Sequence, residues 1–443
     1  MKSLPYEKHT LSNGVRLLLI DVPGVNSVAT CVMVGVGSRY ETKAINGVSH
    51  FLEHMVFKGT KKYPTTEDVN TIERQGGLQN AYTDIDITNY HNKVLSTDWA
   101  LALEINKELA LKPLLEEKYI QKERNVILEE MKRYEDEPAA KVEEAFHAMM
   151  YPDTKLGMRI IGERESLMTL KGATLKGYHD LWYKPERIVV VLAGRITNHE
   201  LRIKEKTEEW FGTMHNSRFM IHDSKRKKKD GEENPEGYSK VTDLQIAPRL
   251  EVVTKPDASQ AHLVIGLRTF ARASVDRFAW NVFNLLMGIS FTSRLFKEIR
   301  EKRGLCYHIR SSSNNWADVG NWSIYAGVGT EQVTQATQAI LEELAKAVEK
   351  GIGEDEIVVS KKRLKTILSF KSEDPEFFTE YYGRQELFGE PLMTLDDYIK
   401  KIEMVTKEDI DRLLQKYFVT KNLNMALVWN KPRDEKLENL LQI

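Results

Sequence analysis

Apolar and polar residues follow two different periodicities along the first half of the chain. Asn13-Gly14 stands between apolar residues and predicts a β-hairpin. The run Val28–Val34 has the apolar, β-branched character of a strand, whereas apolar residues from Gly47 to Phe57 recur at helical spacing. Helical spacing returns between Glu116 and Met150, and Ile188–Gly194 is typical of a buried strand. The first half therefore mixes strands and helices.

The second half of the chain has a similar order of elements. Leu250–Val253 and Ala261–Gly266 are predicted strands, Phe278–Arg300 is a predicted helical stretch, and Leu423–Trp429 is a closing strand. Because strands and helices do not alternate strictly in either half, the pattern favours the α+β class. A duplication is possible, although residue identity between the halves is weak.

A segment of different composition lies near the middle of the chain. Residues 223–237, with the sequence DSKRKKKDGEENPEG, contain no large apolar residue and carry blocks of like charge, as solvated linkers do. A basic run can also bind nucleic acid, but an acidic run follows this one directly. We therefore predict a first domain at residues 1–215, a charged linker at 216–245 and a second domain at 246–443.

Composition narrows the class of protein. The 443 residues suggest two or three domains, and an apolar fraction of 41% with 29% charged residues indicates a soluble globular protein. Because 64 Lys and Arg balance 65 Asp and Glu, no nucleic-acid partner is expected. The sequence predicts a cytoplasmic protein without a membrane partner, because its two cysteines are far apart and no apolar window reaches roughly 18 residues. Its start, MKSLPYEKHTLSNGV, also does not resemble a signal peptide.

Candidate chemistry begins with the pattern H-x-x-E-H at His50, Glu53 and His54. On a helix the two histidines lie one turn apart on one face, so both imidazoles can bind one metal ion. Glu53 lies at the edge of the same face, close enough to act on a bound water. Two histidine ligands beside a carboxylate base is the arrangement of zinc hydrolases, with the order of H-E-x-x-H reversed. Taken alone, so short a pattern also arises by chance on helix surfaces.

Catalytic zinc sites commonly have a third protein ligand. Glu123 and Glu130 stand seven residues apart, on one face of one predicted helix. The alternative interpretation is an ordinary charged helix surface.

Several segments together resemble the pitrilysin/insulinase family of inverted-motif zinc peptidases. They are His50–Thr60 (HFLEHMVFKGT), Asn80–Thr83 (NAYT) and Glu123–Glu130 (ERNVILEE) in the first half. Leu295–Tyr307 (LFKEIREKRGLCY) resembles the family motif of the second half, and Gly162–Gly194 the end of the first domain. The nearest branch is that of the mitochondrial processing peptidase and its short bacterial relatives. No motif position is missing.

The resemblance implies two α/β-roll domains of similar fold, each a mixed sheet with packed helices. It implies one zinc ion per chain, held by His50, His54 and Glu130. Glu53 then corresponds to the general base on zinc-bound water, and Glu123 to a second acidic residue that supports the site. The implied activity is that of a zinc metalloendopeptidase.

The resemblance also implies substrate contacts and partners. Arg300 and Tyr307 match residues that approach the scissile carbonyl, and the segment that receives the peptide matches Asn80, Ala81, Tyr82 and Thr83. The expected substrates are unfolded peptides or presequences, cleaved within a chamber. The expected assembly is a homodimer or a heterodimer with a related subunit. The alternatives are a non-catalytic scaffold or partner subunit of the same family, which typically lacks a ligand or the base, and a zinc enzyme of another reaction type.

Overall fold

The chain folds into two compact units. The computed structural model describes residues 5–214, 237–238, 240–242, 244–433 and 435–443. Among these, unit 1 gathers residues within 1–129, 158–239 and 369–396, and unit 2 those within 130–157, 240–368 and 397–443. The predicted linker at 216–245 lies mostly outside the described residues.

The units do not follow the chain in two consecutive blocks. Residues 130–157 precede the predicted linker but belong to unit 2, and residues 369–396 follow it but belong to unit 1. The first of these segments carries a helix that packs on the second sheet, and the other carries a helix that packs on the first sheet. The boundaries at 215 and 246 therefore stay a prediction about domains along the sequence. The two compact units each include residues from both sides of these boundaries.

Unit 1 contains a six-stranded mixed sheet in the order β1-β2-β6-β3-β5-β4. The predicted strands and the hairpin are confirmed: β1 and β2 pair antiparallel, and Gly14 in their turn has a φ of 98°, which glycine adopts without strain. The strands are β1 (Tyr6–Thr10), β2 (Arg16–Asp21), β3 (Ser27–Val34), β4 (Leu78–Thr83), β5 (Thr88–Leu95) and β6 (Ile188–Gly194).

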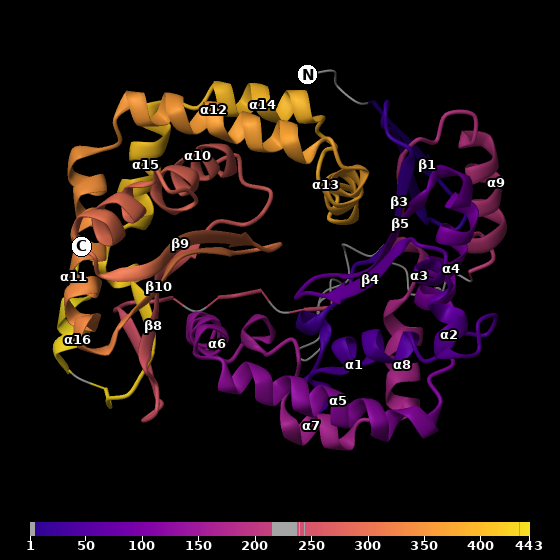
Figure 1. The fold of residues 1–443 in the computed structure, drawn as a ribbon, viewed down its shortest axis with the longest axis horizontal. Coiled ribbons are helices and arrows are strands. Elements are labelled where there is room, and N and C mark those ends of the chain that lie inside the picture. Colours follow the sequence, from indigo (N-terminus) through magenta and orange to yellow (C-terminus); the bar gives the residue numbers. More distant parts are fainter. Residues whose placement is uncertain (1–4, 215–236, 239, 243, 434) are drawn as a thin grey trace, which may run out of the picture. The chain divides into compact units, whose positions relative to one another are not determined.

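Helices cover both faces of this sheet (Figure 1). Helix α4 packs on β3 and β5, and helix α13 packs on β3 and β6. Every residue of β6 is buried, as its apolar run predicts. The helices of this unit are α1 (Val48–Val56), α2 (Thr66–Val69), α3 (Thr71–Arg74), α4 (Trp99–Leu111), α5 (Glu117–Asp136, which continues into unit 2), α7 (Arg164–Thr169), α8 (Gly172–Trp182), α9 (Glu200–Phe211) and α13 (Pro375–Leu387).

The long helical region predicted between Glu116 and Met150 is two helices. Helix α5 ends at Asp136, and α6 begins at Pro138, which occupies its first turn. Glu137 between them has an extended backbone, with φ −87° and ψ 106°. Proline disfavours helical geometry at the residue before it but fits the first turn of a new helix. The proline therefore accounts for the break.

Unit 2 contains a five-stranded sheet in the order β7-β11-β8-β10-β9. The strands are β7 (Arg249–Thr254), β8 (Gln260–Thr269), β9 (Cys306–Asn315), β10 (Gly320–Gly329) and β11 (Asn424–Trp429). The helices are α6 (Pro138–Met150), α10 (Arg277–Gly288), the π-helical η6 (Phe296–Lys302), α11 (Val333–Lys350), α12 (Glu354–Lys371, whose last turn enters unit 1), α14 (Leu395–Glu403, which begins in unit 1), α15 (Lys407–Tyr417) and α16 (Glu435–Leu440). The three strands predicted for this half are confirmed.

The helix predicted from Phe278 to Arg300 is interrupted. Helix α10 ends at Gly288, and helical structure resumes only at Phe296 in the π-helical η6. In the gap, the Ser290 hydroxyl accepts a hydrogen bond from the backbone N–H of Thr292 at 3.3 Å. Serine and threonine side chains that bond to nearby backbone compete with helical bonding, which explains the break.

The two sheets share one topology. When β1 is left aside, each sheet places its five strands in the chain order first, fifth, second, fourth, third. In each the first and fifth strands are parallel and the other pairs are antiparallel. The third strands, β4 and β9, therefore take equivalent edge positions. This repeat confirms the predicted two-domain α+β fold with two similar halves.

In the described part of the chain, no helix combines the length and apolar character needed to cross a bilayer.

Candidate metal centre

Helix α1 carries the H-x-x-E-H motif within the predicted helical stretch. Its apolar residues, among them Phe51, Leu52 and Met55, are buried, while His50 and His54 are partly exposed. The two imidazole rings lie with their centres 4.7 Å apart. The helical spacing thus brings both rings together on one face, as the sequence predicts.

A buried carboxylate holds the first turn of this helix. Glu41 is fully buried, and its carboxylate accepts hydrogen bonds from the backbone N–H groups of Gly47 at 2.7 Å and Ser49 at 2.8 Å. The side-chain amide of Asn46 donates a third at 2.8 Å. Burial raises the pKa of Glu41 to about 7 despite these three donors. The carboxylate satisfies N–H groups that a helix start leaves open, and so fixes where α1 begins.

Glu130 completes a cluster of possible metal ligands. Helix α5 runs unbroken through Glu123 and Glu130, so the two carboxylates stand on one face two turns apart. One ligand atom each from His50, His54 and Glu130 lie within 4.8 Å of one another, and all three residues are partly exposed. Two histidines and a glutamate form a donor set known for catalytic zinc, which keeps a fourth position for water. The residues present therefore fit zinc.

Glu123 supports this cluster from the side. Its carboxylate lies 3.5 Å from Nδ1 of His54 and 2.8 Å from Nζ of Lys58. Burial opposes ionisation of Glu123, but the hydrogen bonds and charges of His54 and Lys58 outweigh it, and its pKa is lowered. A carboxylate at Nδ1 orients the imidazole so that Nε2 is presented to a metal.

Glu53 is held by the edge strand of the first sheet. Its Oε2 accepts a hydrogen bond from the hydroxyl of Thr83, the last residue of β4, at 2.6 Å. Glu53 does not belong to the ligand cluster, although it stands on the same helix between the two histidines. The hydrogen bond from Thr83 therefore holds a carboxylate on the same helix as the two histidines.

The predicted peptide-receiving segment lies in β4, which ends the sheet and pairs only with β5 among the described strands. The side-chain oxygen of Asn80 accepts a hydrogen bond from the backbone N–H of Ala81 at 2.9 Å. The phenol of Tyr82 points instead to helix α13 and donates to Glu380 at 2.8 Å. The four residues thus share an edge strand but differ in their side-chain contacts.

Arg300 and Tyr307 are brought together in unit 2. Arg300 stands in the π-helical η6, and its guanidinium carbon lies 4.7 Å from the ring centre of Phe296 and 5.1 Å from that of Tyr307. Tyr307, near the start of edge strand β9, is 80% exposed, so its hydroxyl is accessible within this unit.

Sequence reasoning missed two residues of the site, Glu41 and Lys58. Lys58 follows His54 by four residues, and a basic residue at that spacing could have indicated a partner for an acidic group near the motif. Glu41 precedes helix α1 with no regular spacing to it, so its capping role is visible only in the fold.

Two α+β halves of one topology, the first carrying an inverted H-x-x-E-H helix, are features of the inverted-motif metallopeptidase class. The chain belongs to the insulinase family, peptidase family M16: residues 16–164 match the family described as "Insulinase (Peptidase family M16)", and residues 169–364 match the one described as "Peptidase M16 inactive domain". The family resemblance of the sequence is thereby confirmed.

Particular relatives agree with this assignment. The chain is 33% identical to the uncharacterized zinc protease YmxG of Bacillus subtilis over 422 residues, which cover 95% of this chain and 98% of the relative. A solved protease from Helicobacter pylori has the same fold, with a TM-score of 0.85 at 24% identity over 97% of this chain and 100% of that one. The periplasmic protease PqqL from Escherichia coli gives a TM-score of 0.77 at 19% identity over 99% of this chain but 50% of PqqL.

Proposed function

We propose that the chain is a zinc-dependent endopeptidase that cleaves unfolded peptides or presequences, with Glu53 as its general base. The observation that carries this proposal is the convergence of His50, His54 and Glu130. Glu53, on the same helix as the two histidines, is held by Thr83. The name zinc protease, given to the B. subtilis relative, supports the same activity.

His50, His54 and Glu130 would hold one zinc ion per chain. When bound, zinc lowers the pKa of a coordinated water and polarises a substrate carbonyl. Glu123 would keep the His54 ring in its metal-binding orientation, and Lys58 would keep Glu123 ionised. These contacts support a preorganised site.

Glu53 would move the protons of the reaction. Its carboxylate takes a proton from the attacking water and later delivers it to the leaving amine. The hydrogen bond from Thr83 to Oε2 orients the carboxylate for this task. Arg300 and Tyr307 would donate hydrogen bonds to the developing oxyanion, the role that matching residues of the family imply.

The peptide would add to the sheet as a further strand beside β4. Main-chain pairing at a sheet edge gives affinity without demanding a particular sequence, and it requires an extended chain. An incoming carbonyl would replace the Asn80 side chain at the N–H of Ala81. Unfolded peptides are therefore the proposed substrates, and folded proteins should be poor ones.

A non-catalytic partner subunit is the second candidate function. It is favoured by the description "inactive domain" for the family that matches residues 169–364. However, the proposed ligands and base all precede residue 169 and lie within the match at 16–164. We therefore place the proposed metal centre and general base in the first half of this chain.

We also propose a reducing compartment, the cytoplasm. Cys31 and Cys306 are both free thiols, and Cys31 is fully buried in the first sheet. Free thiols persist where disulfides do not form readily.

The proposal is tested by separating the base from the ligands. Glu53→Gln should lower the rate of hydrolysis of a quenched peptide by about 10²–10⁴-fold, the usual contribution of a general base. Its zinc content should stay that of the wild type. Glu130→Gln should lose zinc affinity, whereas Glu129→Gln, on the exposed face of α5, should keep both zinc and activity. Near-normal turnover by Glu53→Gln, or a zinc-loaded Glu130→Gln beside an empty Glu129→Gln, contradicts the assignment.

A further inference from the structure

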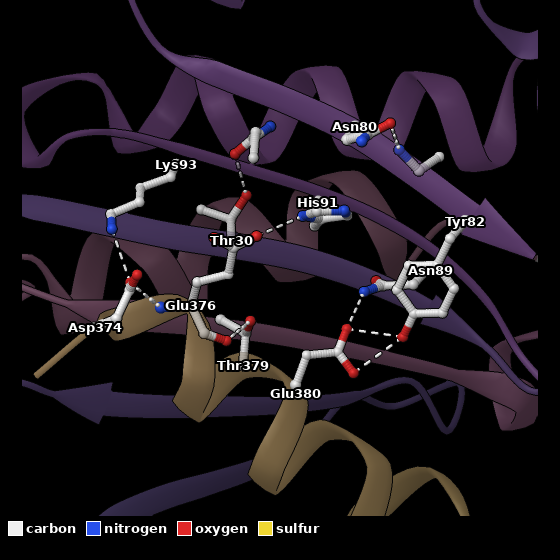
Figure 2. Close-up of polar contacts among 12 residues, drawn as sticks. Thr30, Asn80, Tyr82, Asn89, His91, Lys93, Asp374, Glu376, Thr379 and Glu380 are labelled. Atoms are coloured by element: carbon white, nitrogen blue, oxygen red, sulfur yellow. Dashed lines mark hydrogen bonds and ion pairs between the residues drawn. The ribbon is translucent and has the colours of Figure 1, made fainter. Parts of the chain in front are cut away.

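Helix α13 lays a row of charged side chains against the face of the first sheet next to its edge (Figure 2). Asp374, which caps this helix, accepts a hydrogen bond from Nζ of Lys93 at 2.8 Å. Glu376, one residue into the helix, lies 2.9 Å from Nδ1 of His91. Lys93 and His91 are alternate residues of β5, so the helix follows that strand.

Glu380 differs from its neighbours because it reaches the edge strand. Its Oε1 accepts hydrogen bonds from the phenol of Tyr82 at 2.8 Å and from the side-chain amide of Asn89 at 2.7 Å. Tyr82 of β4 and Asn89 of β5 are directly opposite each other in the sheet. One carboxylate thus binds both members of a cross-strand pair, and we call these contacts of Glu380 with Tyr82 and Asn89 the clamp.

Arg384 closes this arrangement one turn further along α13. Its Nε donates to Oε2 of Glu380 at 2.9 Å, and its terminal NH2 donates to the oxygen of Tyr82 at 3.0 Å. Burial raises the pKa of Tyr82, which keeps the phenol protonated as a donor to Glu380. In the trio of Tyr82, Glu380 and Arg384, donors therefore face acceptors.

The clamp lies next to the proposed base along the chain. Tyr82 is followed directly by Thr83, whose hydroxyl bonds Glu53 at 2.6 Å. An edge strand has a neighbour on one side only, so contacts from a packed helix contribute more to its position than they would for a central strand. Loss of the clamp would loosen β4 at the residues proposed to pair with peptide.

We propose that Glu380 is a positioning residue for peptide binding: through Tyr82 and Asn89 it fixes edge strand β4 in the place where an extended peptide pairs. This inference rests on the proposed function and names the determinant of its substrate affinity. Glu380 is not one of the proposed metal ligands, and it stands in the half of the chain beyond the predicted linker. The chain contributes to its own peptide site from both halves.

Glu376 provides a matched control. It stands one turn before Glu380 on α13, and the exposed fractions of the two side chains are similar, at 38% and 33%. Its carboxylate contacts His91 of β5 rather than a residue of β4. Glu376→Ala therefore removes a helix–sheet contact of the same kind and leaves the edge-strand clamp in place.

The test compares KM and kcat on two quenched peptides, one long enough to pair along all of β4 and one too short to do so. Glu380→Ala should raise KM for the long peptide about five- to tenfold, the effect of roughly one lost hydrogen-bonded contact, and leave kcat within about twofold. Tyr82→Phe should have the same effect, and the double variant should add little more because both remove one clamp. Glu380→Gln, which keeps a carbonyl oxygen, should restore part of the affinity, and Glu376→Ala should match the wild type.

The outcomes separate this inference from the proposed function. If the wild type cleaves the long peptide and Glu53→Gln does not, but Glu380→Ala raises KM no more than Glu376→Ala, the clamp is overturned and the peptidase stands. If Glu380→Ala does not fold by circular dichroism, Tyr82→Phe decides, and an unchanged KM overturns the clamp. An equal KM rise on both peptides also overturns it, because pairing along β4 would then not be the step affected. An active Glu53→Gln enzyme overturns the proposed function itself.

Discussion

Glu41 illustrates, at the scale of one residue, how a buried acid can organise a site without belonging to it. It holds the N–H groups of Gly47 and Ser49, and the next residue along the chain is the first histidine of the cluster. Gly47 itself has a φ of 91°, and a Cβ there would meet the carbonyl oxygen of Ile161 at 2.7 Å. The start of helix α1 is therefore fixed by one carboxylate and by one position that only glycine fits.

The raised pKa of Glu41 gives a prediction about stability. Because burial raises this pKa from 4.5 to about 7, the folded state holds the proton between these values while an unfolded chain releases it. The contribution of Glu41 to the free energy of unfolding is therefore present below about pH 4.5 and is lost as pH rises through about 7. The full loss is about 3 kcal/mol, on the scale of ~1.4 kcal/mol per pKa unit.

Glu41→Gln should remove this pH dependence, since the amide does not titrate. Urea unfolding of metal-free wild type and variant from pH 4.5 to 8 should show a difference in unfolding free energy that shifts in favour of the variant as pH rises. Glu205→Gln, on the exposed face of α9, serves as the control and should track the wild type. A difference between Glu41→Gln and wild type that is constant with pH would contradict the prediction.

The sequence shows some residues of the site directly and hides others. His50, Glu53 and His54 were predictable because helical spacing alone places them on one side of a short helix. The contact between Thr83 and Glu53 was not, because the two residues are 30 positions apart and meet only when β4 lies beside α1. The roles assigned to Arg300, Tyr307 and the β4 residues stay predictions.

At the scale of elements, buried strands were the most predictable part of the fold. The β6 prediction agrees with the structure at both ends, because a continuous apolar run marks a strand covered on both faces. The two helix breaks were harder to predict. Pro138 gives a local signal that the apolar periodicity obscured, whereas the break after Gly288 depends on serine and threonine bonding and on close packing against Ser311.

The placement of α13 could not be predicted from local sequence. Its apolar residues Phe378 and Tyr382 join a core made by Cys31, Met33 and Val191 of the first sheet, 187 or more residues earlier in the chain. Helical periodicity shows that a helix has an apolar face but not which sheet covers it. Element type follows from the local pattern, and the packing partner does not.

Phe378→Ala should lower the free energy of unfolding, because it removes part of the contact between α13 and the first sheet. The side chain is 2% exposed, and truncation of a buried phenylalanine costs about 3–5 kcal/mol. Phe370, eight residues earlier and 67% exposed, is the matched control, and Phe370→Ala should change the free energy of unfolding by less than about 0.5 kcal/mol. Urea denaturation followed by circular dichroism measures both, and equal losses would argue against a structural role for α13 in unit 1.

At the scale of the whole molecule, the proposed catalytic groups are divided between the two halves. The proposed ligands and base precede the predicted linker, and Arg300 and Tyr307 follow it. PqqL is matched over only 50% of its length, so one such chain has room for two copies of the present fold. We propose that the working unit is a dimer, either of two copies or of this chain with a related subunit, in which Arg300 and Tyr307 act on the partner's metal centre. Two-fold pairs are the commonest closed assemblies.

Subunit mixing tests this arrangement. Glu53→Gln and Arg300→Ala/Tyr307→Phe chains should each be nearly inactive alone. After equal mixing and exchange, half of the dimers are mixed and each has one complete site, so activity should return to about one quarter of the wild-type value. If exchange is proven by mass spectrometry and activity does not return, each site is completed within one chain.

The crossing of α13 into the first sheet has a consequence for protein synthesis. The ribosome must add roughly 180 residues after the last strand of that sheet before it reaches Pro375, which takes roughly 10–35 seconds at about 5–20 residues per second. During that interval the proposed zinc ligands have already been translated, but the apolar face that α13 covers is still open and β4 lacks its contact with Glu380. A nascent chain of this protein should therefore acquire the proposed peptidase activity late, after most of its own sequence is made, and should need chaperones to shield that face until then.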